Sequence, residues 1–230
     1  MSKKELEAFD PNARPDFMPA EVGEGGPKGH DMGIDDVAIP RIDLLQDLSP
    51  ETMKRKEEYV QGAMPGTFLN SVTKKLYGDS FEFIPVDFRL NFFVWRKRDL
   101  GGGLVGIFDT QEEAREVLDE ECDIVPTHQH FILTVDGLDF AVLSMSRSKL
   151  GVSKQLNSLV GMTGKDRFEV VYRLSSQSVS NRMNQEYWNI KVKQLRYTDK
   201  TQYEAAMNLY DRIRSDEAMK VDDHYSPYGE

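Results

Sequence analysis

The sequence predicts a mainly β fold with a few added helices (α+β). Several runs alternate apolar and polar residues between turn-forming residues, which is typical of strands with one buried face. A few other segments repeat apolar residues at helical spacing. The chain has 230 residues, of which 39% are hydrophobic, enough for one domain with its own core and no disulfide bonds.

The predicted strands form hairpins. Asp136-Gly137, between two such runs, is a strong hairpin signal, and Ser180-Asn181-Arg182 is the turn of the last hairpin. The first hairpin pairs a short strand with the longest strand of the chain. The expected strands are residues 67–72, 81–97, 130–135, 140–145, 168–175 and 187–197.

Capping residues place the helices. Ser49 followed by Pro50 suits a helix start. Thr110 with Glu113 three residues later forms a capping box. The expected helices are residues 52–59, 110–121, 152–160 and 201–214, the last an amphipathic helix that closes the fold.

Charge and composition divide the chain into three parts. Residues 1–36 are rich in Gly, Pro and acids and form a predicted acidic, flexible arm. Residues 37–214 form the folded domain, including the closing helix, and residues 215–230 form an acidic tail. We expect the two acidic ends to compete with a polyanion for cationic surfaces, or to dock replication proteins of the phage or its host.

The sequence carries no signature of catalysis, and we expect neither enzymatic activity nor a cofactor. One cysteine leaves no disulfide and no cysteine-based zinc site. The segment before Lys165 resembles a phosphate loop, but Leu159 and Asp166 stand where Gly and Ser/Thr are required. His128 and His130 would share one face of a strand and could bind a metal, but two histidines alone are a weak signal, so no metal is predicted. No apolar run is long enough to span a membrane.

The net charge of −10 hides local basic stripes. Residues 109–123 hold eight acids against one arginine. Basic residues gather instead in residues 89–98, 147–173 and 182–196. An acidic protein can therefore still bind a polyanion, because local charge decides that interaction.

Two strands carry aromatic and cationic residues on one face. In residues 84–94, the even positions are apolar and form a predicted core face, whereas Phe93 and Trp95 lie on the polar face. In the last strand, Trp188 belongs to the predicted core face and Lys191 and Lys193 to the other. Such a face suits single-stranded nucleic acid, whose bases stack on rings while cations hold phosphates. The alternative is that Phe93 and Trp95 cover a second core against the helix at 110–121.

The predicted nucleic-acid contacts come from these strands and from a basic loop and helix between them. They are Arg89, Phe93, Trp95, Arg96, Lys97, Arg98, Arg147, Lys149, Lys154, Arg173, Tyr187, Lys191, Lys193 and Tyr197.

Short sequences spread over residues 37–197 also suggest a family. They are Ile39-Pro40-Arg41-Ile42, Tyr77-Gly78-Asp79, Phe83-Ile84-Pro85-Val86, Val94-Trp95, Ser148-Lys149-Leu150 and Tyr187-Trp188-Asn189-Ile190. With them the chain resembles tailed-phage early proteins regarded as single-stranded DNA-binding proteins. The resemblance implies a five-stranded OB-like Greek-key barrel decorated by short helices, with DNA held on the barrel face without sequence preference during replication, recombination and repair.

Two functions remain open at this point. The first is this non-enzymatic single-stranded DNA-binding protein, located in the cytoplasm of the bacterial host and able to form homo-oligomers. The alternative is a virion or host-takeover module that uses the same aromatic strands as a protein interface. Lysine is depleted from interface cores, so Lys97, Lys191 and Lys193 favour DNA.

Overall fold

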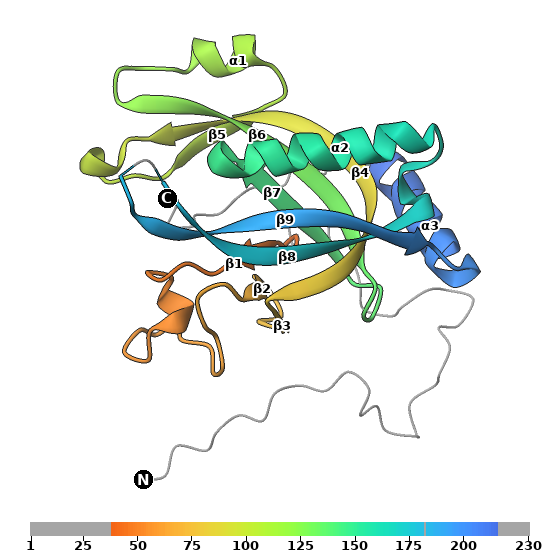
Figure 1. Ribbon diagram of the computed structural model, residues 1–230. Coiled ribbons are helices and arrows are strands. Elements are labelled where there is room, and N and C mark those ends of the chain that lie inside the picture. Colours follow the sequence, from red (N-terminus) through yellow and green to blue (C-terminus); the bar gives the residue numbers. More distant parts are fainter. Residues whose placement is uncertain (1–37, 182, 216–230) are drawn as a thin grey trace, which may run out of the picture. The chain divides into compact units, whose positions relative to one another are not determined.

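The computed structural model describes residues 38–181 and 183–215, apart from the side chain of Arg98. The predicted acidic arm at 1–36 and the acidic tail, except Ser215, lie outside these residues. The described strands form a six-stranded and a three-stranded sheet, both antiparallel (Figure 1). The mainly β prediction with added helices is confirmed.

The elements follow one another along the chain. The strands are β1 (Ile42–Leu44), β2 (Phe68–Asn70), β3 (Leu76–Gly78), β4 (Ser80–Arg96), β5 (Leu104–Phe108), β6 (Cys122–Thr134), β7 (Phe140–Ser146), β8 (Val170–Ser180) and β9 (Glu186–Tyr197). The helices are α1 (Gln111–Glu116), α2 (Leu150–Thr163) and α3 (Lys200–Ser215). Short 3-10 turns are η2 (Pro50–Thr52), η3 (Arg98–Leu100), η4 (Arg147–Lys149) and η5 (Arg167–Glu169).

The large sheet has the strand order β7-β6-β4-β8-β9, with β5 also paired to β4. Within the described residues, no ladder joins β7 to β9, so the predicted five-stranded barrel is not confirmed. The β1 segment instead touches both edges of the open sheet. The Val142 N–H of β7 donates to the Pro40 carbonyl at 2.8 Å, and the Gln46 carboxamide hydrogen-bonds the backbone N–H and carbonyl of Trp188 in β9, both at 2.9 Å.

Each face of the large sheet has its own core. On one face, Phe83, Tyr172 and Ile190 pack with Leu156 of α2. On the opposite face, Ile84, Phe131 and Val171 pack with residues of α3 that include Ile213. Figure 1 shows α2 running alongside β9 and α3 at the end of the sheet where β8 begins and β9 ends. The two helices therefore divide the large sheet into an α2 face and an α3 face.

A bulge in β4 reverses its side-chain alternation. The pairing of β4 with β6 shifts register between Pro85 and Asp87. As a result, Ile84 and Val86 lie in the α3 core, whereas Phe88 contacts His128 and His130 next to α2. The prediction that the even positions from 84 to 94 form a single core face is wrong. Proline lacks a backbone N–H, which is why it favours bulges inside sheets.

Three of the four predicted helices form. The Thr110–Glu113 capping box is present, although α1 ends at Glu116. The helix predicted at 52–59 is wrong: only η2 forms there, and the Ser49 hydroxyl accepts from the Gln46 N–H instead of capping a helix. The helices predicted at 152–160 and 201–214 form as α2 and the amphipathic α3, and α2 ends at Thr163, where Gly164 with its positive φ of 64° is the C-cap.

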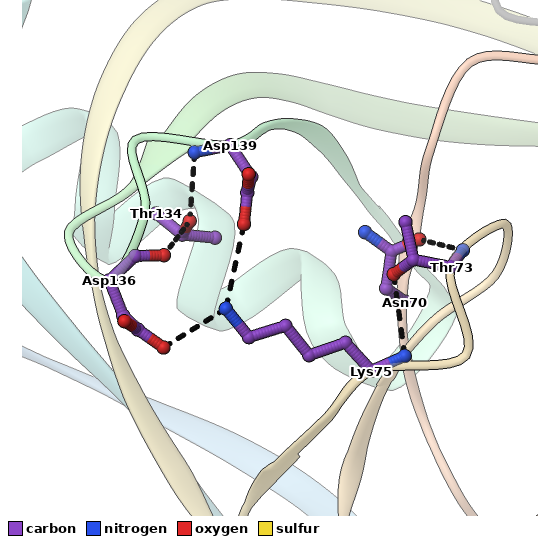
Figure 2. Close-up of polar contacts among 6 residues, drawn as sticks. All are labelled: Asn70, Thr73, Lys75, Thr134, Asp136 and Asp139. Atoms are coloured by element: carbon purple, nitrogen blue, oxygen red, sulfur yellow. Dashed lines mark hydrogen bonds and ion pairs between the residues drawn. The ribbon is translucent and has the colours of Figure 1, made fainter. Parts of the chain in front are cut away.

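Lys75 connects β3 with the turn between β6 and β7. Its ammonium group lies 3.0 Å from a carboxylate oxygen of Asp136 and 3.5 Å from one of Asp139 (Figure 2). Thr134 holds the turn, because its hydroxyl donates to the Asp136 carbonyl and accepts from the Asp139 N–H. This ion pair ties the small sheet to the large one.

Candidate nucleic-acid interface

Strand β9 carries two lysines on the α3 face of the sheet, at the sheet's outer edge. Ile190 and Val192 point into the α2 core, so Lys191 and Lys193 point to the opposite side, where both are exposed. Their cross-strand neighbours are Ser175 and Arg173. Arg173 donates to Glu82 at 2.6 Å, whereas neither lysine has an ion pair or side-chain hydrogen bond within the described residues. The predicted alternation of β9 is confirmed.

A second basic group lies where η4 leads into α2. Residues 140–165 contain four cations and no acid. Arg147 and Lys154 are exposed and Lys149 is half-buried, and none of the three has an ion pair among the residues that the structure describes. Arg147 adopts a positive φ of 48°, a conformation that costs energy for a side-chain-bearing residue and is concentrated at functional sites. No side chain caps the N-terminus of α2.

The two groups border the same strand. Both η4 and α2 contact β9, which lies at the edge of the sheet order. Cations on η4 and α2 thus flank β9 from the α2 side, and its own lysines flank it from the other. We call this set the β9 surface. It consists of Arg147, Lys149, Lys154, Lys191 and Lys193.

The basic residues at the end of β4 have a different environment. The Lys97 ammonium donates to the Glu120 carbonyl, and the charge of Arg96 interacts with that of Asp119. Trp95 is half-buried, with its ring centroid 6.3 Å from that of Phe93. Phe93 is 1% exposed, so the expected open aromatic face is wrong for this residue. We call Trp95, Arg96 and Lys97 the β4 end.

Arg89, Tyr187 and Tyr197 are not counted in either set, and the side chain of Arg98 lies outside the described structure. Arg89 donates to the Ile213 carbonyl of α3 at 3.3 Å and stacks over the Phe131 ring. Tyr187 is half-buried beside Val179, and Tyr197 is 72% exposed. Along β4, the α3-covered positions Ile84 and Val86 separate Glu82, which pairs with Arg173, from Arg89 and the β4 end. The described residues among the fourteen are therefore divided between separate parts of the sheet.

A family model described as Pam3 phage gp34-like protein matches residues 4–219. The chain belongs to this phage protein family. No curated protein and no solved structure matches the chain. The phage part of the predicted resemblance is thus confirmed, and single-stranded DNA binding stays a prediction.

This member of the Pam3 phage gp34-like family also contains a polar cluster around His128 and His130, which the sequence indicated only as weak metal candidates. The Ser153 hydroxyl of α2 lies 2.7 Å from Nδ1 of His128 and 2.6 Å from Nε2 of His130. Arg167 donates from Nη2 to Nδ1 of His130 at 2.9 Å and to the Asn157 carboxamide oxygen at 2.8 Å. The two histidines do share one side of β6, as predicted, but their shared partner is a serine.

Burial shifts the pKa values in this cluster. It lowers the pKa of His130 well below 6.5, and the neighbouring Arg167 and His128 charges act in the same direction. Burial also lowers the pKa of His128, with a further contribution from Lys154. The pKa of Arg167 falls to about 10 for the same reason. At neutral pH both histidines are therefore neutral and Arg167 is protonated.

Within the residues that the structure describes, no group of three or more His, Cys, Asp or Glu side chains could hold a metal ion. Cys122 is buried, and a hydrogen bond with Asp119 raises the pKa of its thiol. No described helix has the length and apolar character needed to cross a membrane.

Proposed function

We propose that this protein binds single-stranded DNA, without catalysing a reaction, along the β9 surface. The observation that carries the proposal is the set of five cations without ion-pair partners in the described residues, Arg147, Lys149, Lys154, Lys191 and Lys193, around one edge strand. Unpaired cations bind phosphates without first giving up a protein partner, and their charge attracts a polyanion despite the net negative charge of the protein.

The side chains around the lysines suit a flexible strand. Lys191 and Lys193 are two residues apart and so about 7 Å apart along β9. Asn189 and Gln177 face one another on the same side and can hydrogen-bond bases or sugars. Tyr187 follows on this face and can stack a base, which is worth about 1–3 kcal/mol. Contacts of these types hold a strand without reading its sequence.

The test compares two charge-matched double variants of the full chain. Binding to a fluorescein-labelled oligo-dT of about 30 nucleotides is followed by anisotropy at low salt. Lys191→Gln/Lys193→Gln should lose roughly ten- to hundredfold in affinity, because each of the two solvent-exposed contacts is worth about 0.7–1.4 kcal/mol. Arg96→Gln/Lys97→Gln, which removes the same charge from the β4 end, should change affinity less than threefold.

Two results would overturn the proposal. If the unmodified chain binds no oligonucleotide at low salt, the alternative of a phage protein-interaction module gains support. Equal losses in both double variants would show that net charge, and not the β9 surface, governs binding.

A further inference from the structure

The hydrogen bonds of the buried polar cluster run in one direction only. The Arg167 guanidinium has donors and no acceptor, so Nδ1 of His130, 2.9 Å away, must accept. A neutral His130 then carries its proton on Nε2, which faces Ser153 at 2.6 Å and donates to it. Because the Ser153 oxygen receives this bond, its own proton points to the remaining neighbour, Nδ1 of His128 at 2.7 Å.

This order fixes the proton of His128 as well. With Nδ1 accepting from Ser153, a neutral His128 must hold its proton on Nε2, at the other edge of the ring. Nε2 has no hydrogen-bond partner among the residues of the described ranges. It is also absent from the buried side-chain atoms that lack a partner there, and His128 is only half-buried. The buried series of hydrogen bonds therefore ends in a donor, the Nε2–H of His128, that reaches the surface.

The surface around this donor is basic. His128 lies opposite the exposed Leu90 on β4, and its charge state responds to Lys154, the residue after Ser153 in α2. Lys154 belongs to the β9 surface, and residues 140–165 contain no acid. A donor without an acceptor beside an unpaired ammonium group suits a ligand oxygen that carries negative charge.

We infer that His128 is a further nucleic-acid contact, which donates from Nε2 to a phosphate oxygen, and that Ser153, His130 and Arg167 are positioning residues that hold it in this tautomer. The inference rests on the proposed function for its ligand, but its proton arrangement does not. No charge has to move: the imidazole stays neutral, and Lys154 supplies the positive charge.

The first arm of the test reads the tautomer without DNA. Long-range proton–nitrogen spectra of the uniformly nitrogen-15-labelled full chain at neutral pH, assigned with His128→Phe and His130→Phe, report which ring nitrogen is protonated. We expect Nε2–H on both histidines. Ser153→Ala removes the donor to His128 and should give a mixture of its two tautomers. An Nδ1–H on His128 of the unmodified chain would overturn the inference.

The second arm measures oligo-dT affinity at low salt. His128→Phe should lose about three- to tenfold, the contribution of one hydrogen bond, and His128→Gln, which keeps a side-chain N–H, should lose less. Circular dichroism melting shows that each variant is folded. If the unmodified chain binds DNA and His128→Phe binds equally well, the contact is wrong although the proposed function stands. If the unmodified chain does not bind, the proposed function fails, and with it the contact.

Discussion

Strand β9 and the β4 end have similar sequences but different surroundings in the structure. Each combines a tryptophan, neighbouring cations and an alternating strand. At β9 the tryptophan packs inward against Gly66 and the lysines are unpaired within the described residues. At the β4 end, Lys97 donates to the backbone carbonyl of Glu120, and the charge of Arg96 interacts with that of Asp119. The difference comes from residues 109–123, which hold eight acids and whose buried Ala114 and Cys122 pack with Val94 of β4.

A basic stripe is thus a binding candidate only when no acidic element folds beside it. The segment from α1 to β6, which contains Asp119 and Glu120, supplies that element for β4. The neighbours of β9, namely β8, η4 and α2, contain no acidic residue. Charge along the sequence shows which side chains are available, and the strand order decides which of them stay unpaired.

The largest expected effect is a difference in the free energy of unfolding between alanine variants of Trp188 and Trp95. The Trp188 ring lies so close to Gly66 that a Cβ there would come within 2.6 Å of it, and Gln46 holds the backbone of Trp188. Trp188→Ala should therefore lower the free energy of unfolding by about 3 kcal/mol, measured by urea denaturation. Trp95→Ala, at the end of β4, should cost less than about 2 kcal/mol. Equal losses would contradict the distinction between the two strands.

The second effect concerns the η4 half of the β9 surface. Arg147→Gln/Lys149→Gln should weaken oligo-dT binding about tenfold, because it removes two unpaired phosphate contacts. Lys54→Gln/Arg55→Gln, two exposed cations after η2, removes the same charge outside the β9 surface and serves as the control for net charge. If the η4 variant binds oligo-dT as tightly as the unmodified chain, Arg147 and Lys149 do not contact DNA, and only the lysines of β9 remain as proposed contacts.

Much of the fold could be predicted from the sequence, because capping boxes and turn residues specify helix starts and hairpins through contacts between neighbouring residues. The Thr110–Glu113 capping box and the Asp136-Gly137 turn specify their elements within a few residues. The bulge after Pro85 is not specified in this way, since it depends on how β4 pairs with β6. A proline inside a predicted central strand was the available signal for it.

The candidate site was predicted less well than the fold. The alternation of β9 held, because no bulge interrupts Trp188 to Lys193. The environment of the β4 end depends on contacts with a segment more than twenty residues away, which alternation cannot reveal. The Ser153 bridge between His128 and His130 joins β6 to α2, and only the packing of that helix on the sheet brings the three together.

The third effect is a pH dependence that belongs to the α2 side of the molecule. The pKa of His130 is lowered in the folded chain by burial, Arg167 and His128, whereas an unfolded histidine titrates near pH 6.5. Below that pH the unfolded chain binds a proton that the folded chain does not. Stability is therefore complete above about pH 7 and falls as pH decreases, by up to about 1.4 kcal/mol per pH unit for this group.

Urea denaturation between pH 7.5 and about pH 5.5 measures this slope. His130→Gln can keep the hydrogen bonds to Arg167 and Ser153 and cannot titrate, so its slope should be shallower than that of the unmodified chain. Identical slopes would mean that His130 gains its proton in the folded state, against the burial described above.

The smallest effect tests the β4 end by gain of binding. Asp119→Asn/Asp123→Asn removes two acids beside Arg96 and Trp95. It should raise oligo-dT affinity two- to threefold at low salt, because it frees cations for phosphate. Glu204→Gln/Asp211→Asn on α3 changes the net charge equally, and should raise affinity less. A gain of the same size in both would leave the acidic neighbours without a specific role.

The salt dependence of oligo-dT binding tests the central claim most directly. For a single strand, the logarithm of the association constant falls with the logarithm of salt concentration by about 0.7 for each phosphate contact. Lys191→Gln/Lys193→Gln should therefore reduce the slope by about 1.4, and Arg96→Gln/Lys97→Gln should leave it unchanged. An unchanged slope in the first variant, or an equal reduction in the second, would contradict the placement of DNA on the β9 surface.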